Sequence, residues 1–219
     1  MTAMNPERWN ATQDYLRTVF GREDPLLAEL AADAKRSGLP DISISADVGR
    51  LLDVLVRTTR ARAVLELGTL GGYSAIWMAR ALAPDGRLIT VELDPKRADF
   101  ARRWFERAGV SDRVTVLEGP ALTKIPTALG ALGGSLDVAF LDAVKTEYPA
   151  YLRALRDHIA PGGLLLADNV LGSSAWWIDE AGRPDRDAVD AFNRELASDP
   201  AFDVAAVPIR EGVLIARRR

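Results

Sequence analysis

The middle of the chain alternates short, nearly continuous apolar runs with amphipathic segments. Five such runs occur: Ala63–Leu67, Arg87–Glu92, Val114–Leu117, Leu136–Leu141 and Gly163–Asp168. Strands that are buried on both faces have this pattern, so the runs predict a parallel sheet covered by helices. The segments between them predict four helices, at about Tyr73–Leu82, Pro95–Ala108, Leu122–Leu132 and Glu147–Ile159.

The amino-terminal region has a helical rather than a strand-like spacing of apolar residues. It predicts one helix over Pro6–Phe20 and a second that starts at Asp24-Pro25 and ends at Ser37-Gly38. Aspartate followed by proline is a common start of a helix. A third helix is expected to follow, capped by Ser45 or Asp47.

The carboxyl-terminal region reads as an antiparallel hairpin. Phe202–Val207 and Val213–Arg217 are separated by a short segment that contains Gly212. Together these patterns predict an α/β fold with about seven strands, mostly parallel, and helices on both faces. We expect one domain over 1–219, with an amino-terminal helical segment (1–40) that serves as cap or dimer contact and a core over 41–219.

Composition narrows the chemistry. The chain has 219 residues, no cysteine, one histidine, and 28 basic against 31 acidic residues, a net charge of −3. Disulfides, thiolate nucleophiles and cysteine-based metal sites are excluded. The charge makes nucleic acid an unlikely partner and favours a small neutral or anionic ligand. No apolar run approaches the roughly 18 residues of a membrane span, and Met1–Trp9 lacks a secretory pattern, so a cytoplasmic location is expected.

A glycine-containing turn follows the first predicted strand, in Leu65–Ser74. Ligands of open α/β sheets bind at such strand ends, where glycine allows close approach. The spacing is neither the dinucleotide fingerprint nor a P-loop. Glu92 ends the second strand and could accept both hydroxyls of a ribose, although a plain turn and a solvated acid are equally compatible. Glu66 lies inside an apolar strand, where an ammonium- or amide-bearing ligand would explain its carboxylate.

Three oxygen-bearing side chains follow the fourth and fifth predicted strands, Asp142, Asp168 and Asn169. Two carboxylates and an amide suit Mg²⁺, with Mn²⁺ or Ca²⁺ possible, and do not suit zinc. Lys145 lies about one helical turn from Asp142, and beside a cation a neutral amine is favoured, which would make it a general base. The alternative is that the three oxygen-bearing side chains separately cap or solvate the strand ends and that Lys145 is an ordinary surface lysine.

Residues 64–74, Val-Leu-Glu-Leu-Gly-Thr-Leu-Gly-Gly-Tyr-Ser, resemble motif I of the class I S-adenosylmethionine-dependent methyltransferases, which have a Rossmann-like fold. More narrowly, the chain resembles the cation-dependent O-methyltransferases of catechol and caffeoyl-CoA. The likeness also includes Val91–Asp94, Glu118–Ala121, Pro161–Gly163 and Asp168-Asn169. It implies a set of residues that bind S-adenosylmethionine: Ile44, Glu66, Gly68, Thr69, Ser74, Glu92, Ala121 and Asp142.

The same resemblance implies that Asp142, Asp168 and Asn169 bind the metal and that Lys145 is the catalytic lysine. One position departs from it: the common pattern is Asp-Ala-Asp-Lys, and this chain has Val144 in place of the second acid. The matched ligand is the first acid, so the metal site is retained. The missing second acid would lie toward the cofactor or the acceptor, so its replacement by Val144 puts in doubt how that part of the site contacts its ligand.

The segment after Asn169 contains Trp176-Trp177 within a loop-like sequence. In similar proteins this segment borders the acceptor, so either indole could stack on an aromatic ring; packing against the sheet or a partner subunit is the alternative. We therefore expect a homodimeric O-methyltransferase that acts on one hydroxyl of a catechol-like small phenol. A tRNA hydroxyuridine methyltransferase and a cofactor-binding protein without catalysis are the competing interpretations.

Overall fold

The computed structural model describes residues 5–22 and 24–219, and the expectations for residues 1–4 and 23 lie outside them. Its main sheet has seven strands in the order β3-β2-β1-β4-β5-β9-β8. Strands β1 to β5 are parallel, and β9 pairs antiparallel with both β5 and β8. The strands are β1 (Ala63–Leu67), β2 (Arg87–Glu92), β3 (Val114–Glu118), β4 (Leu136–Leu141), β5 (Ile159–Asp168), β8 (Phe202–Val207) and β9 (Val213–Arg218). The Rossmann-like α/β fold expected from the sequence is confirmed.

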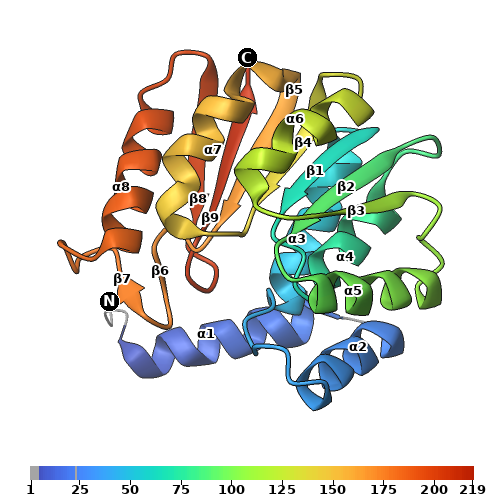
Figure 1. Cartoon of the computed structure of the whole chain (residues 1–219). Helices are drawn as coiled ribbons and strands as arrows, with labels where there is room; N and C mark the ends of the chain where they lie inside the picture. The colour runs from blue at the N-terminus through green and yellow to red at the C-terminus, as the bar shows by residue number, and fades with distance from the viewer. Residues whose placement is uncertain (1–4, 23) are drawn as a thin grey trace.

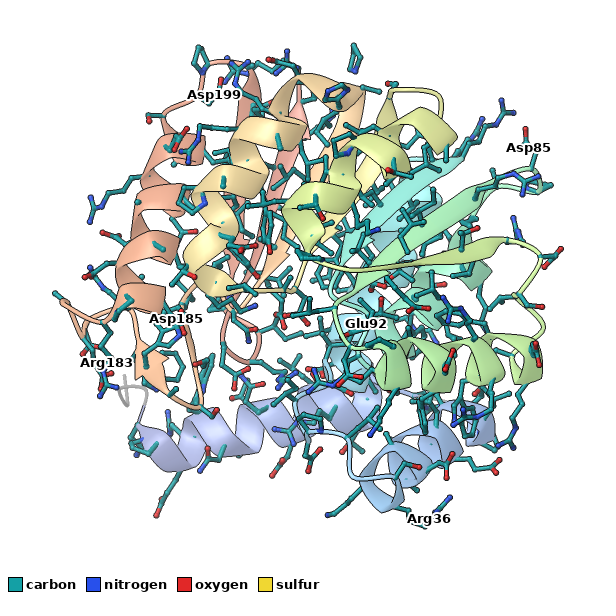
Figure 2. The ribbon with its side chains drawn as sticks, in the orientation of Figure 1. Arg36, Asp85, Glu92, Arg183, Asp185 and Asp199 are labelled. Atoms are coloured by element: carbon teal, nitrogen blue, oxygen red, sulfur yellow. The ribbon has the colours of Figure 1, made fainter. Side chains whose placement is uncertain are left out.

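Helices cover both faces of the sheet (Figure 1). They are α1 (Pro6–Val19), α2 (Pro25–Arg36), α3 (Ala46–Thr58), α4 (Tyr73–Ala81), α5 (Pro95–Arg107), α6 (Ala121–Ala131), α7 (Tyr148–Leu155) and α8 (Pro184–Ala197). Helices α2 to α5 share one apolar core with the sheet, and α6 to α8 share a second core on the opposite face. Helices α1 and α2 lie beyond the end of the sheet at which Glu92 is found (Figures 1 and 2).

Local sequence explains where the helices begin. The Asp24 carboxylate accepts a hydrogen bond from the Leu27 amide at 3.0 Å, and Asp94 accepts one from the Lys96 amide at 2.8 Å. In both helices proline occupies the first turn, where its missing N–H costs nothing. The third helix begins at Ala46, so Ser45 takes the cap position by backbone geometry, although its hydroxyl makes no capping bond.

Two boundaries differ from the sequence-based expectation. The fifth strand begins at Ile159 rather than Gly163, because Ile159 already pairs with Leu136 before the register shifts toward Val138. The preceding helix is correspondingly shorter than expected. It is the α-helix α7, flanked by the 3-10 turns η1 (Lys145–Glu147) and η2 (Arg156–His158).

The segment between Asn169 and Phe202 contains structure that the sequence analysis did not predict. Gly172–Ser173 (β6) and Trp176–Trp177 (β7) pair as a small antiparallel hairpin, and helix α8 follows. The described helices include none that is long and apolar enough to cross a membrane.

Candidate active site

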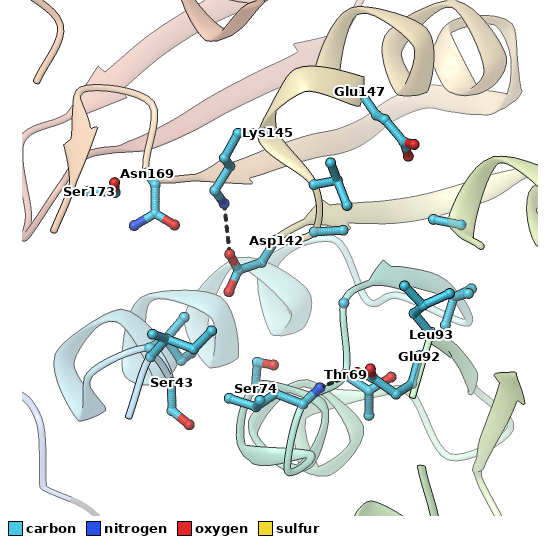
Figure 3. Close-up of a pocket in the computed structure, with 18 of the residues that line it drawn as sticks. Ser43, Thr69, Ser74, Glu92, Leu93, Asp142, Lys145, Glu147, Asn169 and Ser173 are labelled. Atoms are coloured by element: carbon cyan, nitrogen blue, oxygen red, sulfur yellow. Dashed lines mark hydrogen bonds and ion pairs between the residues drawn. The ribbon is translucent and has the colours of Figure 1, made fainter. Parts of the chain in front are cut away.

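A cavity of about 580 Å³ lies at the carboxyl ends of the central parallel strands. Most of the residues that the sequence singled out line it: Ile44, Gly68, Thr69, Ser74, Glu92, Ala121, Asp142, Lys145, Asn169 and Trp176. Figure 3 shows Asp142 and Lys145 at its centre, Glu92 and Leu93 on one side, and Asn169, Ser173 and Ser43 on the other. Glu66 and Asp168 lie behind the cavity wall, and Trp177 lies outside it with 45% of its surface exposed.

Gly68 allows the end of β1 to meet the end of β4. Its φ is +97°, a conformation that favours glycine, and a Cβ there would collide with the carbonyl group of Asp142. The Asp142 amide in turn donates to the Leu67 carbonyl at 2.9 Å. The glycine turn after β1 therefore lies in direct contact with the Asp142 loop after β4.

The carboxylate of Glu92 is buried and fixed by backbone donors. One oxygen accepts from the Leu70 amide at 2.8 Å, and the other accepts from the Asp94 amide at 3.0 Å. Each carboxylate oxygen has two acceptor sites, so both can still accept a further hydrogen bond. The group is thus oriented at the cavity edge with acceptor capacity free for hydroxyl groups of a ligand.

Glu66 finds its partners inside the protein. The hydroxyls of Ser74 and Thr90 each donate to its carboxylate at 2.5 Å, and Thr69 shares a 2.6 Å hydrogen bond with Thr90. Complete burial raises the pKa of Glu66 to about 8, because the loss of hydration and the negative charges of Asp142 and Glu92 outweigh the two hydrogen bonds that stabilise the carboxylate. In the sequence analysis this buried carboxylate is explained by an ammonium- or amide-bearing ligand, whereas in the structure two hydroxyl groups of the protein donate to it.

Lys145 connects the fourth and fifth strand ends. Its ammonium lies 2.9 Å from Asp142 Oδ1 (Figure 3). It also lies 2.7 Å from the hydroxyl of Tyr148, which is within hydrogen-bond distance of the backbone carbonyls of Leu141 and Asp168. Burial lowers the pKa of Lys145, but the charge of Asp142 and the Tyr148 hydroxyl outweigh it, so the net pKa is raised. Tyr148 was not predicted; its position three residues after Lys145 was the available signal.

Asp168 is 2% exposed, and its Oδ1 has no hydrogen-bond partner among the described residues. Burial, followed by the negative charge of Asp142, raises the pKa of Asp168. Asn169, the next residue, has a left-handed backbone (φ +57°) and lines the cavity. An unpartnered buried carboxylate oxygen beside a second carboxylate and an amide fits a hard cation, for which all three are suitable donors.

The described residues contain no group of three or more His, Cys, Asp or Glu arranged to hold a metal. The expected set includes only two carboxylates and relies on the Asn169 amide as its third oxygen. Val144 lines the cavity and is 49% exposed, so the position that departs from the common pattern presents an apolar side chain to the ligand.

The side of the cavity away from Glu92 is built from distant segments. Trp176 is 3% exposed and packs into the core on the face of α7 and α8 while lining the cavity. Arg210, in the β8–β9 loop, also lines it and donates from Nη1 to the Ser43 carbonyl at 3.0 Å. Sequence reasoning did not find Arg210, because nothing local in the chain links it to this site.

Comparison with known proteins agrees with this arrangement. A family model described as O-methyltransferase matches residues 18–219. A catechol O-methyltransferase of Niastella koreensis is 36% identical over 91% of this chain and 90% of its own length, and one of Mycobacterium tuberculosis is 38% identical over 88% and 86%. The crystal structure of an O-methyltransferase from Bacillus cereus in complex with SAH superposes with a TM-score of 0.88 at 32% identity, covering 97% of this chain and 99% of that one.

The sheet order, the glycine turn and the acidic residue that ends β2 define a methyltransferase fold with a ligand cavity at its strand ends. This chain belongs to the O-methyltransferase family.

Proposed function

We propose that this protein transfers a methyl group from S-adenosylmethionine to one hydroxyl of a catechol-like small molecule. One observation carries the proposal: a single cavity joins the Glu92 side to the Asp142, Lys145 and Asn169 cluster. The relatives named as catechol O-methyltransferases and the SAH complex of the Bacillus cereus protein support it.

The Glu92 side of the cavity is assigned to S-adenosylmethionine. Both Glu92 oxygens are oriented toward a ribose by backbone donors, and Ala121 and Ile44 supply apolar wall. Gly68, Thr69 and Ser74 are placed along the methionine portion. Glu66 lies behind this wall, so its role is to orient the Ser74 hydroxyl rather than to contact the ligand.

Asp142, Asp168 and Asn169 would hold a divalent cation, with Mg²⁺ first and Mn²⁺ or Ca²⁺ as alternatives. When bound, such an ion lowers the pKa of a phenolic hydroxyl and can hold both oxygens of a vicinal diol. The donor set fits, because within residues 5–22 and 24–219 Asp168 Oδ1 is buried without a hydrogen-bond partner, and Asp142 Oδ1 is bonded to Lys145.

Lys145 is assigned to accept the proton of the reacting hydroxyl. In the metal-free protein the Asp142 carboxylate holds Lys145 as an ammonium. Once the Asp142 charge is engaged elsewhere, burial dominates and favours the neutral amine. Tyr148 keeps the Lys145 nitrogen beside Asp142 through its 2.7 Å hydrogen bond. Trp176 forms the apolar wall beside the acceptor ring.

The test is methyl transfer from labelled S-adenosylmethionine to catechol, with resorcinol as the matched acceptor whose hydroxyls are not vicinal. We expect transfer to catechol only, its loss with EDTA, and its return with Mg²⁺. Equal transfer to both acceptors, or full activity in EDTA, contradicts the role of a bound cation. If the protein binds S-adenosylhomocysteine tightly but transfers no methyl group to any vicinal diol, catalysis is contradicted and a binding protein is favoured. If it transfers the methyl group only to added tRNA, the nucleic-acid alternative is favoured.

The proposal includes two features of the whole chain that the sequence analysis expected. They are a homodimer that uses the amino-terminal segment and a cytoplasmic location. Tyr15 and Phe20 support the first, because they are 61% and 54% exposed on and just after α1, with ring centroids 6.2 Å apart.

A further inference from the structure

Arg210 is a charged residue of the cavity wall for which the proposed reaction gives no role. It lies in the loop between β8 and β9 with φ +50°, a left-handed conformation that is uncommon outside glycine. Non-glycine residues in this region are concentrated at binding sites, where the surrounding structure holds them in place. Arg60 has the same φ but lies outside the cavity, so it is the place of Arg210 in the cavity wall, and not its backbone alone, that points to a ligand.

The loop is fixed to the metal-side segment by its backbone. The amide of Val170 donates to the Gly212 carbonyl at 3.1 Å, and the amide of Leu171 donates to the Glu211 carbonyl at 2.8 Å. Val170 directly follows Asn169, so these two bonds set the loop beside the proposed cation ligands. The Arg210 amide also points to Gln13 Oε1 of α1, at 3.4 Å.

The guanidinium of Arg210 is only partly used by the protein. Nη1 donates to the Ser43 carbonyl at 3.0 Å, and Nε lies 3.0 Å from Glu211 Oε2. The second terminal nitrogen, Nη2, has no hydrogen bond to the residues that the structure describes. The Arg210 side chain is 22% exposed. One nitrogen is thus held by a hydrogen bond, a second faces the Glu211 carboxylate as an ion pair, and Nη2 remains available for a further partner.

Its location assigns Arg210 to the acceptor side. Ser43 lies opposite Glu92 and Leu93 across the cavity, on the same side as Asn169 and Ser173 (Figure 3). Arg210 touches Ser43 and is tied to the segment after Asn169, so its charge is at the end where the acceptor ring would lie. The acidic residues Asp185 and Glu211 also line the cavity, and Glu211 already faces Nε of Arg210, so an incoming anion would have to bind the part of the guanidinium that Glu211 does not face.

We propose that Arg210 is a specificity-determining residue that selects catechols whose ring carries a carboxylate, held by the free edge of the guanidinium. Arginine suits this task because its planar fork matches a carboxylate and stays charged at any working pH. This inference rests on the proposed function, which places the acceptor ring at this end of the cavity. It adds the chemical class of the acceptor, a catechol that carries a carboxylate.

Binding is measured by calorimetry on protein saturated with Mg²⁺ and S-adenosylhomocysteine, with two acid–amide pairs of the same shape. The pairs are 3,4-dihydroxybenzoate with its amide, and 3,4-dihydroxycinnamate with its amide. Because a hydrogen bond to a charged group contributes more than one to a neutral group, we expect at least one acid to bind about tenfold or more tightly than its amide. In Arg210→Gly, which keeps the left-handed backbone without strain, this ratio falls to about one.

Arg60→Gly is the matched control. Arg60 is an exposed arginine with the same φ of +50°, and it lies after α3, outside the cavity. It should retain the acid preference. Arg210→Lys keeps the charge but loses the fork, and it should retain only part of the preference.

The wild-type protein overturns the inference if it binds acids and amides equally. The inference is also wrong if Arg210→Gly weakens both members of a pair to the same extent. Failure of the proposed function appears separately, as no methyl transfer to catechol itself. The acid-to-amide binding ratio then still decides whether Arg210 selects a carboxylate.

Discussion

Glu66 shows how much one side chain can depend on its surroundings. It is fully buried in β1 with two hydroxyl donors and no cation, and this raises its pKa from 4.5 to about 8. Between those two pH values the folded chain keeps the proton that the unfolded chain has released. The free energy of unfolding should therefore fall as pH rises through this window, and the contribution of Glu66 is lost above it.

Glu66→Gln removes this titration and keeps the shape of the side chain. We expect urea unfolding of the ligand-free protein to show equal or lower stability of the variant at pH 5, and a relative gain of a few kcal/mol by pH 8.5. Parallel stability curves for the two proteins between pH 5 and 8.5 would show that Glu66 does not titrate there.

A second prediction at the residue scale concerns the role of Asp168 as a metal ligand. In Asp168→Asn the charge that the cation needs is removed while the buried volume stays the same. We expect metal-dependent turnover to fall about 100-fold or more, since even outer partners of metal ligands cost 10- to 100-fold. The thermal shift caused by Mg²⁺ should also disappear, whereas the metal-free protein should keep its melting temperature or gain slightly, because an unpartnered buried carboxylate is costly.

The control for this experiment is Asp179→Asn, an exposed carboxylate outside the cavity. It should keep both the turnover and the Mg²⁺ shift. A normal Mg²⁺ response in Asp168→Asn means that Asp168 is not a ligand.

Residues differ in how far the sequence alone could place them. Gly68, Glu92 and Asp142 follow apolar strands directly, so strand order brings them to one end of the sheet. Tyr148 and Arg210 could not be placed in this way. Tyr148 lies three residues from Lys145, but their contact depends on the 3-10 turn η1, and the contact of Arg210 with Ser43 joins segments 167 residues apart, which leaves no periodic signal.

At the scale of elements, helix α8 and the β6–β7 hairpin are parts of the fold that the sequence analysis missed. Val189, Phe192 and Leu196 are buried at helical spacing, but acidic and basic residues surround them and Gly182 and Pro184 precede them. Because glycine, proline and charged residues are typical of loops, this segment resembled a loop more than a helix, despite its three apolar positions. The strands β1 to β4 were predicted well because each is nearly continuously apolar.

Helix α8 supports the active site through Phe192. Its ring packs edge-on against Tyr148, with centroids 5.3 Å apart, and Tyr148 holds Lys145. Phe192→Ala should lower the free energy of unfolding by about 3–5 kcal/mol and reduce turnover, because a large cavity opens beneath Tyr148. Denaturant unfolding and kinetics of the same sample measure both effects.

Glu195→Ala, on the exposed side of α8, is the control and should leave both quantities nearly unchanged. A loss of stability in Phe192→Ala with unchanged turnover would mean that α8 does not support the position of Lys145.

At the scale of the whole molecule, we predict a homodimer. The exposed aromatic residues of the amino-terminal segment allow this prediction to be tested by substitution. Size-exclusion chromatography with light scattering should give twice the chain mass of 23.8 kDa. Combined Tyr15→Ser and Phe20→Ser should shift the protein toward monomer, since burial of such aromatic rings contributes strongly to association.

Val54→Ser, another exposed apolar residue but on α3, serves as the control and should remain dimeric. A wild-type protein that is monomeric at micromolar concentration contradicts the expected homodimer.

The two sides of the cavity come from different parts of the chain. Most of the proposed cofactor side lies within one stretch, from Gly68 to Ala121, whereas the proposed acceptor side combines Ser43, Ser173, Trp176 and Arg210. If the two sides are used as proposed, substitutions in the separate acceptor loops would leave the stretch assigned to the methyl donor unaltered. Such a division would give the protein an evolutionary route to new substrates, one loop at a time.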